Sequence, residues 1–112
     1  MTIEQVVEAY FAGMRARDIA ALRALYAEDA TFILPDGRAF DGVAAIGAMH
    51  EGVFAAGAPV PSLGARIVTD NAAAVEVEAQ LPDGTSRFTT NHFYLDDTGK
   101  VAKINVYIKA SL

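Results

Sequence analysis

The stretch IEQVVEAYFAGMRARDIAALRALYAEDATFILPDG, residues 3–37, changes from helical to strand spacing within one run. Apolar residues recur at i, i+3, i+4, i+7, i+8 and i+11 from Ile3, and Thr2 with Gln5 forms a capping box, so we predict a helix over about residues 3–17. Asp18 then caps a second short helix. Its inward-facing side chains are expected to be Ile19, Leu22, Leu25 and Tyr26.

After the two helices we predict a short hairpin, a third helix and then four strands. Residues 31–34 are β-prone, Pro35-Asp36-Gly37 form a turn, and residues 38–40 return as a short strand. Asp41 precedes a third helical pattern, which ends at a Gly57-Ala58-Pro59 breaker. Further strands are expected near 63–69, 73–81, 86–95 and 101–108, separated by hairpin turn signals.

Alternation within the predicted strand at residues 73–81 makes one sheet face apolar. Glu76, Glu78 and Gln80 alternate with Val75 and Val77, which is typical of an antiparallel sheet with one wet face. Helices followed by a meander indicate the α+β class, in which three N-terminal helices pack on a curved, mostly antiparallel sheet. The concave space between them is the expected ligand site.

The composition limits the number of domains, the kinds of partner and the expected location of the protein. The chain has 112 residues, 53% of them hydrophobic and 21% charged, so we expect one domain spanning residues 1–112. A formal charge of −5 argues against nucleic acid as a partner. We find no signal-peptide pattern and no apolar run long enough for a membrane span, so we expect no membrane partner and a cytoplasmic location.

Three polar side chains fall on apolar faces. Tyr10 and His50 lie in the apolar stripes of the first and third helices, and Asn91 shares a strand face with Thr89 and Phe93 while His92 faces the opposite side. Each loses roughly 1 to 3 kcal/mol if buried without a partner. Such groups either satisfy one another in the core, the more common case, or line a cavity and offer donors to a ligand oxygen.

Other chemistries are disfavoured. The chain has no cysteine, and its two histidines have no carboxylate at ligand spacing, so neither a metal nor another cofactor is expected. The serines lie outside any G-x-S-x-G elbow, and the glycine spacings match neither a phosphate loop nor a dinucleotide fingerprint.

Three segments carry a family resemblance across nearly the whole chain: AYFAGMRARDIAALRALYAEDATFILPDG, FDGVAAIGAMHEGVF and NHFYLDDTGKVAKINVYI. They resemble the nuclear transport factor 2-like (NTF2-like) superfamily in its branch of ketosteroid isomerases and SnoaL-like polyketide cyclases. The resemblance implies a cone-shaped roll, with a curved sheet wrapped over three helices and open at its wide end. It also implies a homodimer formed through the sheet.

The same resemblance implies roles for individual residues. Tyr10 matches the oxyanion tyrosine of ketosteroid isomerase, and Asn91 matches its protonated acid, whose hydrogen bond an amide can also donate. His50 and Tyr26 match positions that support the tyrosine, so a Tyr10, His50, Tyr26 network is implied. The aspartate base of the family is Leu34 here. A replacement base would have to be Asp36, ordinarily a turn former, or His50.

The implied cavity wall is apolar, which fits a flat hydrophobic ligand with one or two oxygens, either steroid-like or polyketide-like. An enzyme of this kind would transfer a proton next to a carbonyl. The alternatives are a binding module without chemistry, which Leu34 permits, and a dimeric association domain. The expected wall residues are Phe11, Met14, Phe32, Leu34, Met49, Phe54, Phe93, Ile104, Val106 and Ile108.

Overall fold

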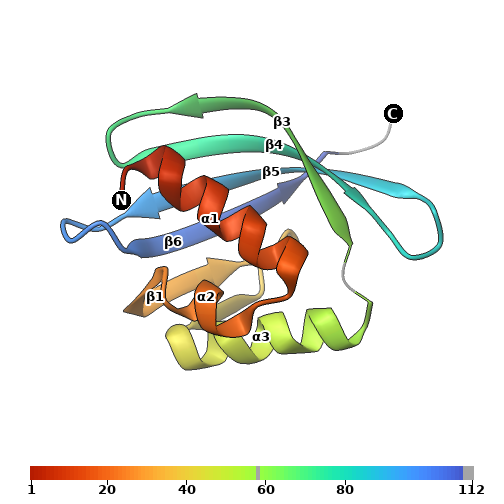
Figure 1. Cartoon of the computed structure of the whole chain (residues 1–112), viewed down its shortest axis with the longest axis horizontal. Helices are drawn as coiled ribbons and strands as arrows, with labels where there is room; N and C mark the ends of the chain where they lie inside the picture. The colour runs from red at the N-terminus through yellow and green to blue at the C-terminus, as the bar shows by residue number, and fades with distance from the viewer. Residues whose placement is uncertain (58, 110–112) are drawn as a thin grey trace.

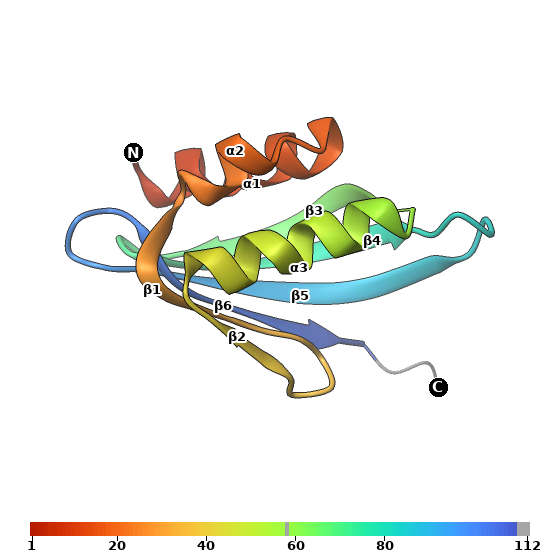
Figure 2. The ribbon, with the colours of Figure 1, turned by 90° about the horizontal axis from the view of Figure 1, so that it is seen from below.

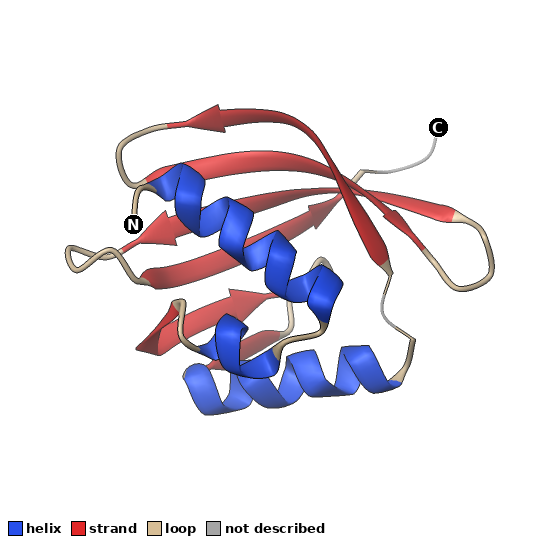
Figure 3. Ribbon diagram, viewed as in Figure 1, coloured by secondary structure: helices blue, strands red, loops and turns tan. Residues whose placement is uncertain are grey.

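The computed structural model describes residues 1–57 and 59–109, and its architecture confirms the α+β class (Figures 1 and 3). The helices are α1 (Ile3–Ala16), α2 (Ile19–Arg23) and α3 (Val43–Ala55). The strands are β1 (Tyr26–Ile33), β2 (Ala39–Asp41), β3 (Val60–Val68), β4 (Ala72–Gln80), β5 (Ser86–Leu95) and β6 (Val101–Ile108). No helix in the described ranges is long and apolar enough to cross a membrane.

Helix α1 has the predicted ends. The backbone N–H of Gln5 donates to Thr2 Oγ1, and the backbone N–H of Thr2 donates to Gln5 Oε1, which is the capping box expected from the sequence. Arg17 closes the helix in the left-handed region at φ 55°. The buried stripe of α1 includes Val6, Val7, Tyr10 and Phe11.

Helix α2 is shorter than predicted. Asp18 caps it as expected, but it ends at Arg23, and Tyr26 begins β1 instead of continuing the helix. Of the predicted strand at residues 31–34, residues 31–33 form the last part of an eight-residue strand, and Leu34 lies just beyond it. The cause is tertiary: Tyr26 pairs in register with Val101 of β6, far along the chain, and that pairing overrides the local helical spacing.

The start of α3 also differs in detail. Asp41 belongs to β2, where its carboxylate accepts a hydrogen bond from Thr31 Oγ1. Gly42, at φ 91°, is the N-cap, a conformation that glycine adopts without steric cost. Of the predicted breaker after this helix, Gly57 has φ 85°, and Ala58 lies outside the described residues.

The six strands form one sheet in the order β2-β1-β6-β5-β4-β3. Every pairing is antiparallel except that of β1 with β6. Strand β3 begins at Val60, three residues earlier than predicted. The sheet curves beneath the helices and is not closed (Figure 2). In β4, Val75 and Val77 are buried while Glu76 and Glu78 are exposed, so the predicted alternation is confirmed.

All three helices lie on the concave face of the sheet (Figure 2). Helix α1 packs over β3 and β4, and α3 packs against β1 and β2. The core between these layers includes Leu22, Ile46, Phe93, Val101 and Ile104, each with no exposed surface. In the described part of the chain no helix covers the outer face of the sheet, so side chains on the concave face are the ones placed to line an internal cavity (Figure 2).

Candidate functional site

A cavity of about 180 Å³ lies between the helices and the concave face of the sheet. Tyr10, His50 and Asn91 all line it, although they come from α1, α3 and β5. Most of the other lining side chains are apolar. Those that the sequence predicted are Phe11, Met14, Phe32, Leu34, Met49 and Val106.

Tyr10 is buried by a cage of aromatic rings. It is 3% exposed, and its ring makes edge contacts with Phe11 at 4.9 Å and Phe93 at 5.2 Å between ring centroids. This burial raises the pKa of the Tyr10 phenol well above its usual value. The hydroxyl therefore keeps its proton at neutral pH and serves as a hydrogen-bond donor.

Asn91 has its amide fixed by a neighbour on the same strand. Thr89 Oγ1 donates to Asn91 Oδ1 over 3.0 Å. Since the amide oxygen accepts this bond, the Nδ2 hydrogens point away from Thr89. Alternation along β5 places both side chains on the concave face, where both line the cavity.

His50 is held by Tyr26. The distance between Tyr26 Oη and His50 Nε2 is 2.9 Å, and both residues are buried. Burial lowers the pKa of His50 to about 4, so the imidazole is neutral at pH 7. Burial, with a smaller contribution from nearby Tyr10, raises the pKa of Tyr26.

The implied three-residue network is therefore present in part. Tyr26 and His50 share a hydrogen bond, while Tyr10 approaches His50 through ring contact, with centroids 6.1 Å apart. Within the described residues, His50 Nδ1 is buried and has no hydrogen-bond partner. His50 therefore lines the cavity with Nε2 already in a hydrogen bond and Nδ1 buried.

Five residues predicted to contact the ligand do not line the cavity, and one of them, Ile104, is fully buried in the core. Tyr26 lies behind His50, and Phe54 stacks on the imidazole ring at 6.3 Å. Phe93 has no exposed surface because the ring of Tyr10 covers it. Ile108 pairs with Thr89 at the end of β6 and is 51% exposed.

Asp36 lies in an exposed turn, apart from the cavity lining. Its carboxylate accepts hydrogen bonds from the backbone N–H of Arg38 at 3.0 Å and from Arg38 Nε at 2.8 Å. These bonds, led by the one from the backbone, lower the pKa of Asp36. Leu34, by contrast, lines the cavity, so an alkyl side chain occupies the position where the resemblance implies a base.

Sequence reasoning missed two polar lining residues, Thr89 and Arg87. Thr89 was placed on the correct face but was given no role, and Arg87 was not considered. Both follow from strand alternation, because residues 87, 89 and 91 share one face of β5. The sequence signal is the alternation that puts the polar residues Arg87 and Thr89 on the same strand face as Asn91.

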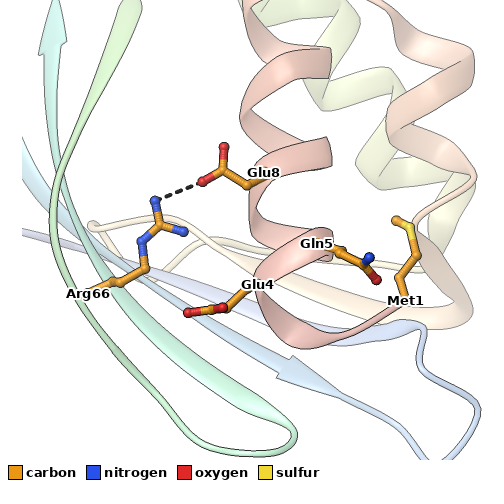
Figure 4. Close-up of a pocket in the computed structure, with 5 residues that line it drawn as sticks. All are labelled: Met1, Glu4, Gln5, Glu8 and Arg66. Carbon is orange, nitrogen blue, oxygen red and sulfur yellow. Dashed lines mark ion pairs between the residues drawn. The ribbon is translucent and has the colours of Figure 1, made fainter.

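A larger hollow lies outside the core (Figure 4). It measures about 570 Å³ and is lined by Met1, Glu4, Gln5, Glu8 and Arg66. Arg66 Nη2 pairs with Glu8 Oε1 at 2.9 Å, so the cation of this hollow is already neutralised. The hollow is open to solvent and most of its lining residues are polar. The smaller, more apolar cavity around Tyr10 is therefore the better candidate for small-molecule binding.

Comparisons with known proteins show the fold and the family of the chain. No curated protein matches the chain. A protein from Sphaerobacter thermophilus has TM-score 0.87 at 21% identity, with 99% of each chain covered. A provisionally assigned ketosteroid isomerase from Kribbella flavida has TM-score 0.86 at 20% identity, covering 96% of this chain and 78% of that one.

A provisionally assigned polyketide cyclase from Sinorhizobium meliloti has TM-score 0.79 at 26% identity, covering 91% of this chain and 93% of that one. The family model of the SnoaL-like domain matches residues 7–104, most of the chain. The chain therefore belongs to the SnoaL-like domain family of the NTF2-like superfamily.

Proposed function

We propose that this protein binds a small hydrophobic carbonyl compound and promotes proton transfer next to the carbonyl, as an isomerase or cyclase does. The observation that carries the proposal is the presence of two neutral donors, Tyr10 and Asn91, in the lining of one apolar cavity. Relatives of similar fold provisionally assigned as a ketosteroid isomerase and a polyketide cyclase support this choice.

The two donors would act on the charge that develops at the ligand oxygen. Loss of the adjacent proton turns the carbonyl into an enolate, and hydrogen bonds aimed at that oxygen strengthen as its negative charge grows. Tyr10 stays protonated because burial raises its pKa, and an amide has no proton to lose at neutral pH. Each donor of this kind contributes about 10² to 10³ in rate.

The proton acceptor is the weak part of the site. No described residue lining the cavity is Asp or Glu, and the carboxylate of Asp36 lies outside the lining, where it accepts a hydrogen bond from Arg38. Tyr26 occupies Nε2 of His50, so we assign His50 a positioning role. In this proposal water or the ligand takes up the proton, and turnover is slow because a positioned base contributes about 10² to 10⁴ in rate.

A second candidate is a binding module that performs no chemistry. The observation that favours it is Leu34 in the cavity lining, since an alkyl group cannot accept a proton. In that case Tyr10 and Asn91 fix the orientation of a bound carbonyl compound, and the apolar wall provides most of the affinity.

Enone isomerisation and ligand binding measured together separate these candidates. We expect wild type to isomerise a small β,γ-enone, and Tyr10→Phe to lower the rate by about 10² to 10³. Thr98→Val also removes one hydroxyl, from an exposed turn outside the cavity lining, and serves as the control. Binding without turnover would favour the module. Equal rates in wild type and Tyr10→Phe, or no binding in a thermal-shift panel of carbonyl compounds, would contradict the proposed function.

We also propose that the outer sheet face forms a homodimer contact. Ile67 is 75% exposed and Tyr107 is 48% exposed, although both are large apolar side chains. Tyr107 lies beside His92 on the same face, with ring centroids 4.8 Å apart. Exposed aromatic and aliphatic groups of this kind are enriched in protein interfaces. A chain whose sheet mattered more than its cavity would be an association domain, the third possibility raised by the sequence.

A further inference from the structure

The strongest unassigned feature is the cation in the cavity lining. Arg87 is the one Lys or Arg among the described residues that line the cavity around Tyr10. Its side chain is exposed, whereas Asn91 on the same strand face is buried. The cavity thus has a buried end with neutral donors and an outer end with a permanent positive charge.

No carboxylate of the described chain neutralises this charge. The ion pairs there are Arg38 with Asp36 and Arg66 with Glu8, and neither includes Arg87. Ala79 is its cross-strand partner. The neighbouring acid Glu78 points to the other face of the sheet, where its Oε2 accepts a hydrogen bond from Ser86 Oγ.

The strand sets the spacing of the two ends. Arg87 and Asn91 are four residues apart on β5, so their Cα atoms lie about 13 Å apart along the strand. Both residues line the cavity, and the long Arg87 side chain can span part of this distance. Thr89 lies between them and continues the polar row.

The volume limits the body of the ligand. A cavity of about 180 Å³ is small beside the roughly 300–1,000 Å³ of sites for drug-sized ligands. It is close to the roughly 150 Å³ engineered cavity in another protein that accepts benzene. One ring therefore fits, whereas the four fused rings of a steroid do not fit without enlargement of the cavity.

We infer that the ligand is a one-ring or equally small carbonyl compound that carries a carboxylate, with its carbonyl at Tyr10 and Asn91 and its carboxylate at Arg87. This inference rests on the proposed function and adds the class of substrate. The planar guanidinium donates two parallel hydrogen bonds to a carboxylate, which a neutral ester cannot reproduce with the same strength. Arg87 is then the residue that selects anionic ligands, in a protein whose overall charge is negative.

The test compares 3-oxocyclohex-1-ene-1-carboxylate with its methyl ester by calorimetric titration. We expect wild type to bind the acid about 5- to 20-fold more tightly than the ester. Arg87→Gln should remove this preference, and Arg87→Lys should retain part of it. Arg15→Gln removes an exposed cation outside the cavity lining and should retain all of it. Added salt should weaken binding of the acid and leave that of the ester unchanged.

The outcomes separate the two proposals. If the ester binds in a Tyr10-dependent manner and the acid gains nothing, the role of Arg87 is wrong and the proposed function stands. If the acid keeps its advantage in Arg87→Gln, another group binds the carboxylate and the inference is also wrong. If neither compound binds wild type, both proposals fail.

Discussion

Tyr26 Oη lies 2.9 Å from His50 Nε2, and this hydrogen bond joins the first residue of β1 to the buried face of α3. Tyr26 is 5% exposed and His50 is 1% exposed, so water is excluded from the pair. Because His50 Nδ1 has no partner in the described part of the chain, the bond to Tyr26 is the one hydrogen bond that its side chain makes there. The pair therefore fixes one wall of the cavity.

We predict that Tyr26→Phe lowers the free energy of unfolding by about 1 to 3 kcal/mol. The substitution keeps the ring but leaves the buried imidazole without its hydrogen bond, and an unsatisfied buried polar group carries a cost of that size. Urea denaturation of wild type and variant measures it. Tyr94→Phe removes a hydroxyl from a 38% exposed ring and should change stability by less than about 0.5 kcal/mol. Equal losses in the two variants would contradict the role of the pair.

We predict that stability falls with acid because of His50. Burial lowers its pKa from 6.5 to about 4, so the unfolded chain binds this proton at a higher pH than the folded chain does. The contribution of neutral His50 to the free energy of unfolding is complete above pH 6.5. It decreases as the pH falls from 6.5 to about 4 and is lost below about pH 4. The total is at most on the order of 3 kcal/mol.

Urea denaturation across this pH range measures the slope. His50→Phe removes the titrating group and should flatten the curve. A curve for His50→Phe that is as steep as that of wild type would mean that carboxylates, not His50, cause the acid sensitivity.

The sequence predicted the fold class and most element positions because spacing and turn residues are local signals. The capping box at Thr2, the strand alternation around Val75 and the third helix are all confirmed. The end of α2 was wrong, since Tyr26 pairs with Val101, a contact 75 residues distant in sequence. Local periodicity carries no information on such a pairing.

The site was predictable in its buried part. Tyr10, His50 and Asn91 were recognised as polar groups on apolar faces, and all three are buried and line one cavity. Their chemical roles stay predictions. Phe54 and Phe93 were misplaced because spacing distinguishes core from surface but does not separate a cavity wall from the solid core behind it. That distinction depends on how the helices pack on the sheet.

We predict opposite effects for two helical glycines. A Cβ on Gly13 would lie 2.9 Å from Leu22 Cδ2, and Leu22 is fully buried, so Gly13→Ala should destabilise the protein by about 1 to 3 kcal/mol. Gly52 in α3 has nothing within 4 Å of the same position. Gly52→Ala should therefore stabilise by about 0.5 to 1 kcal/mol through helix propensity. Thermal unfolding measures both, and loss of stability in Gly52→Ala would contradict the argument.

We predict that Ile67→Asp converts a dimer into single chains. Ile67 is 75% exposed on the outer face of the sheet, and a buried, unpaired carboxylate there would disrupt an apolar contact. Sedimentation velocity should give the mass of two chains for wild type and of one chain for the variant. Ala20→Asp places the same charge on exposed α2, away from the outer face, and should leave the dimer intact. A wild type that sediments as one chain would contradict this assignment.

We predict that Thr89→Val weakens binding of a ketone more than binding of a hydrocarbon of the same shape. Thr89 Oγ1 holds the amide oxygen of Asn91, and without that bond the amide no longer directs its hydrogens into the cavity. Affinity for cyclohex-2-enone should fall about 5-fold, one lost hydrogen bond of about 1 kcal/mol, while affinity for 3-methylcyclohexene should not change. Thr89→Ser keeps the hydroxyl and should bind the ketone with about the affinity of wild type. Only the ketone depends on the orientation of Asn91, so the hydrocarbon should bind as before. Equal losses of affinity for both compounds would show that Thr89 acts only through packing and would contradict the prediction.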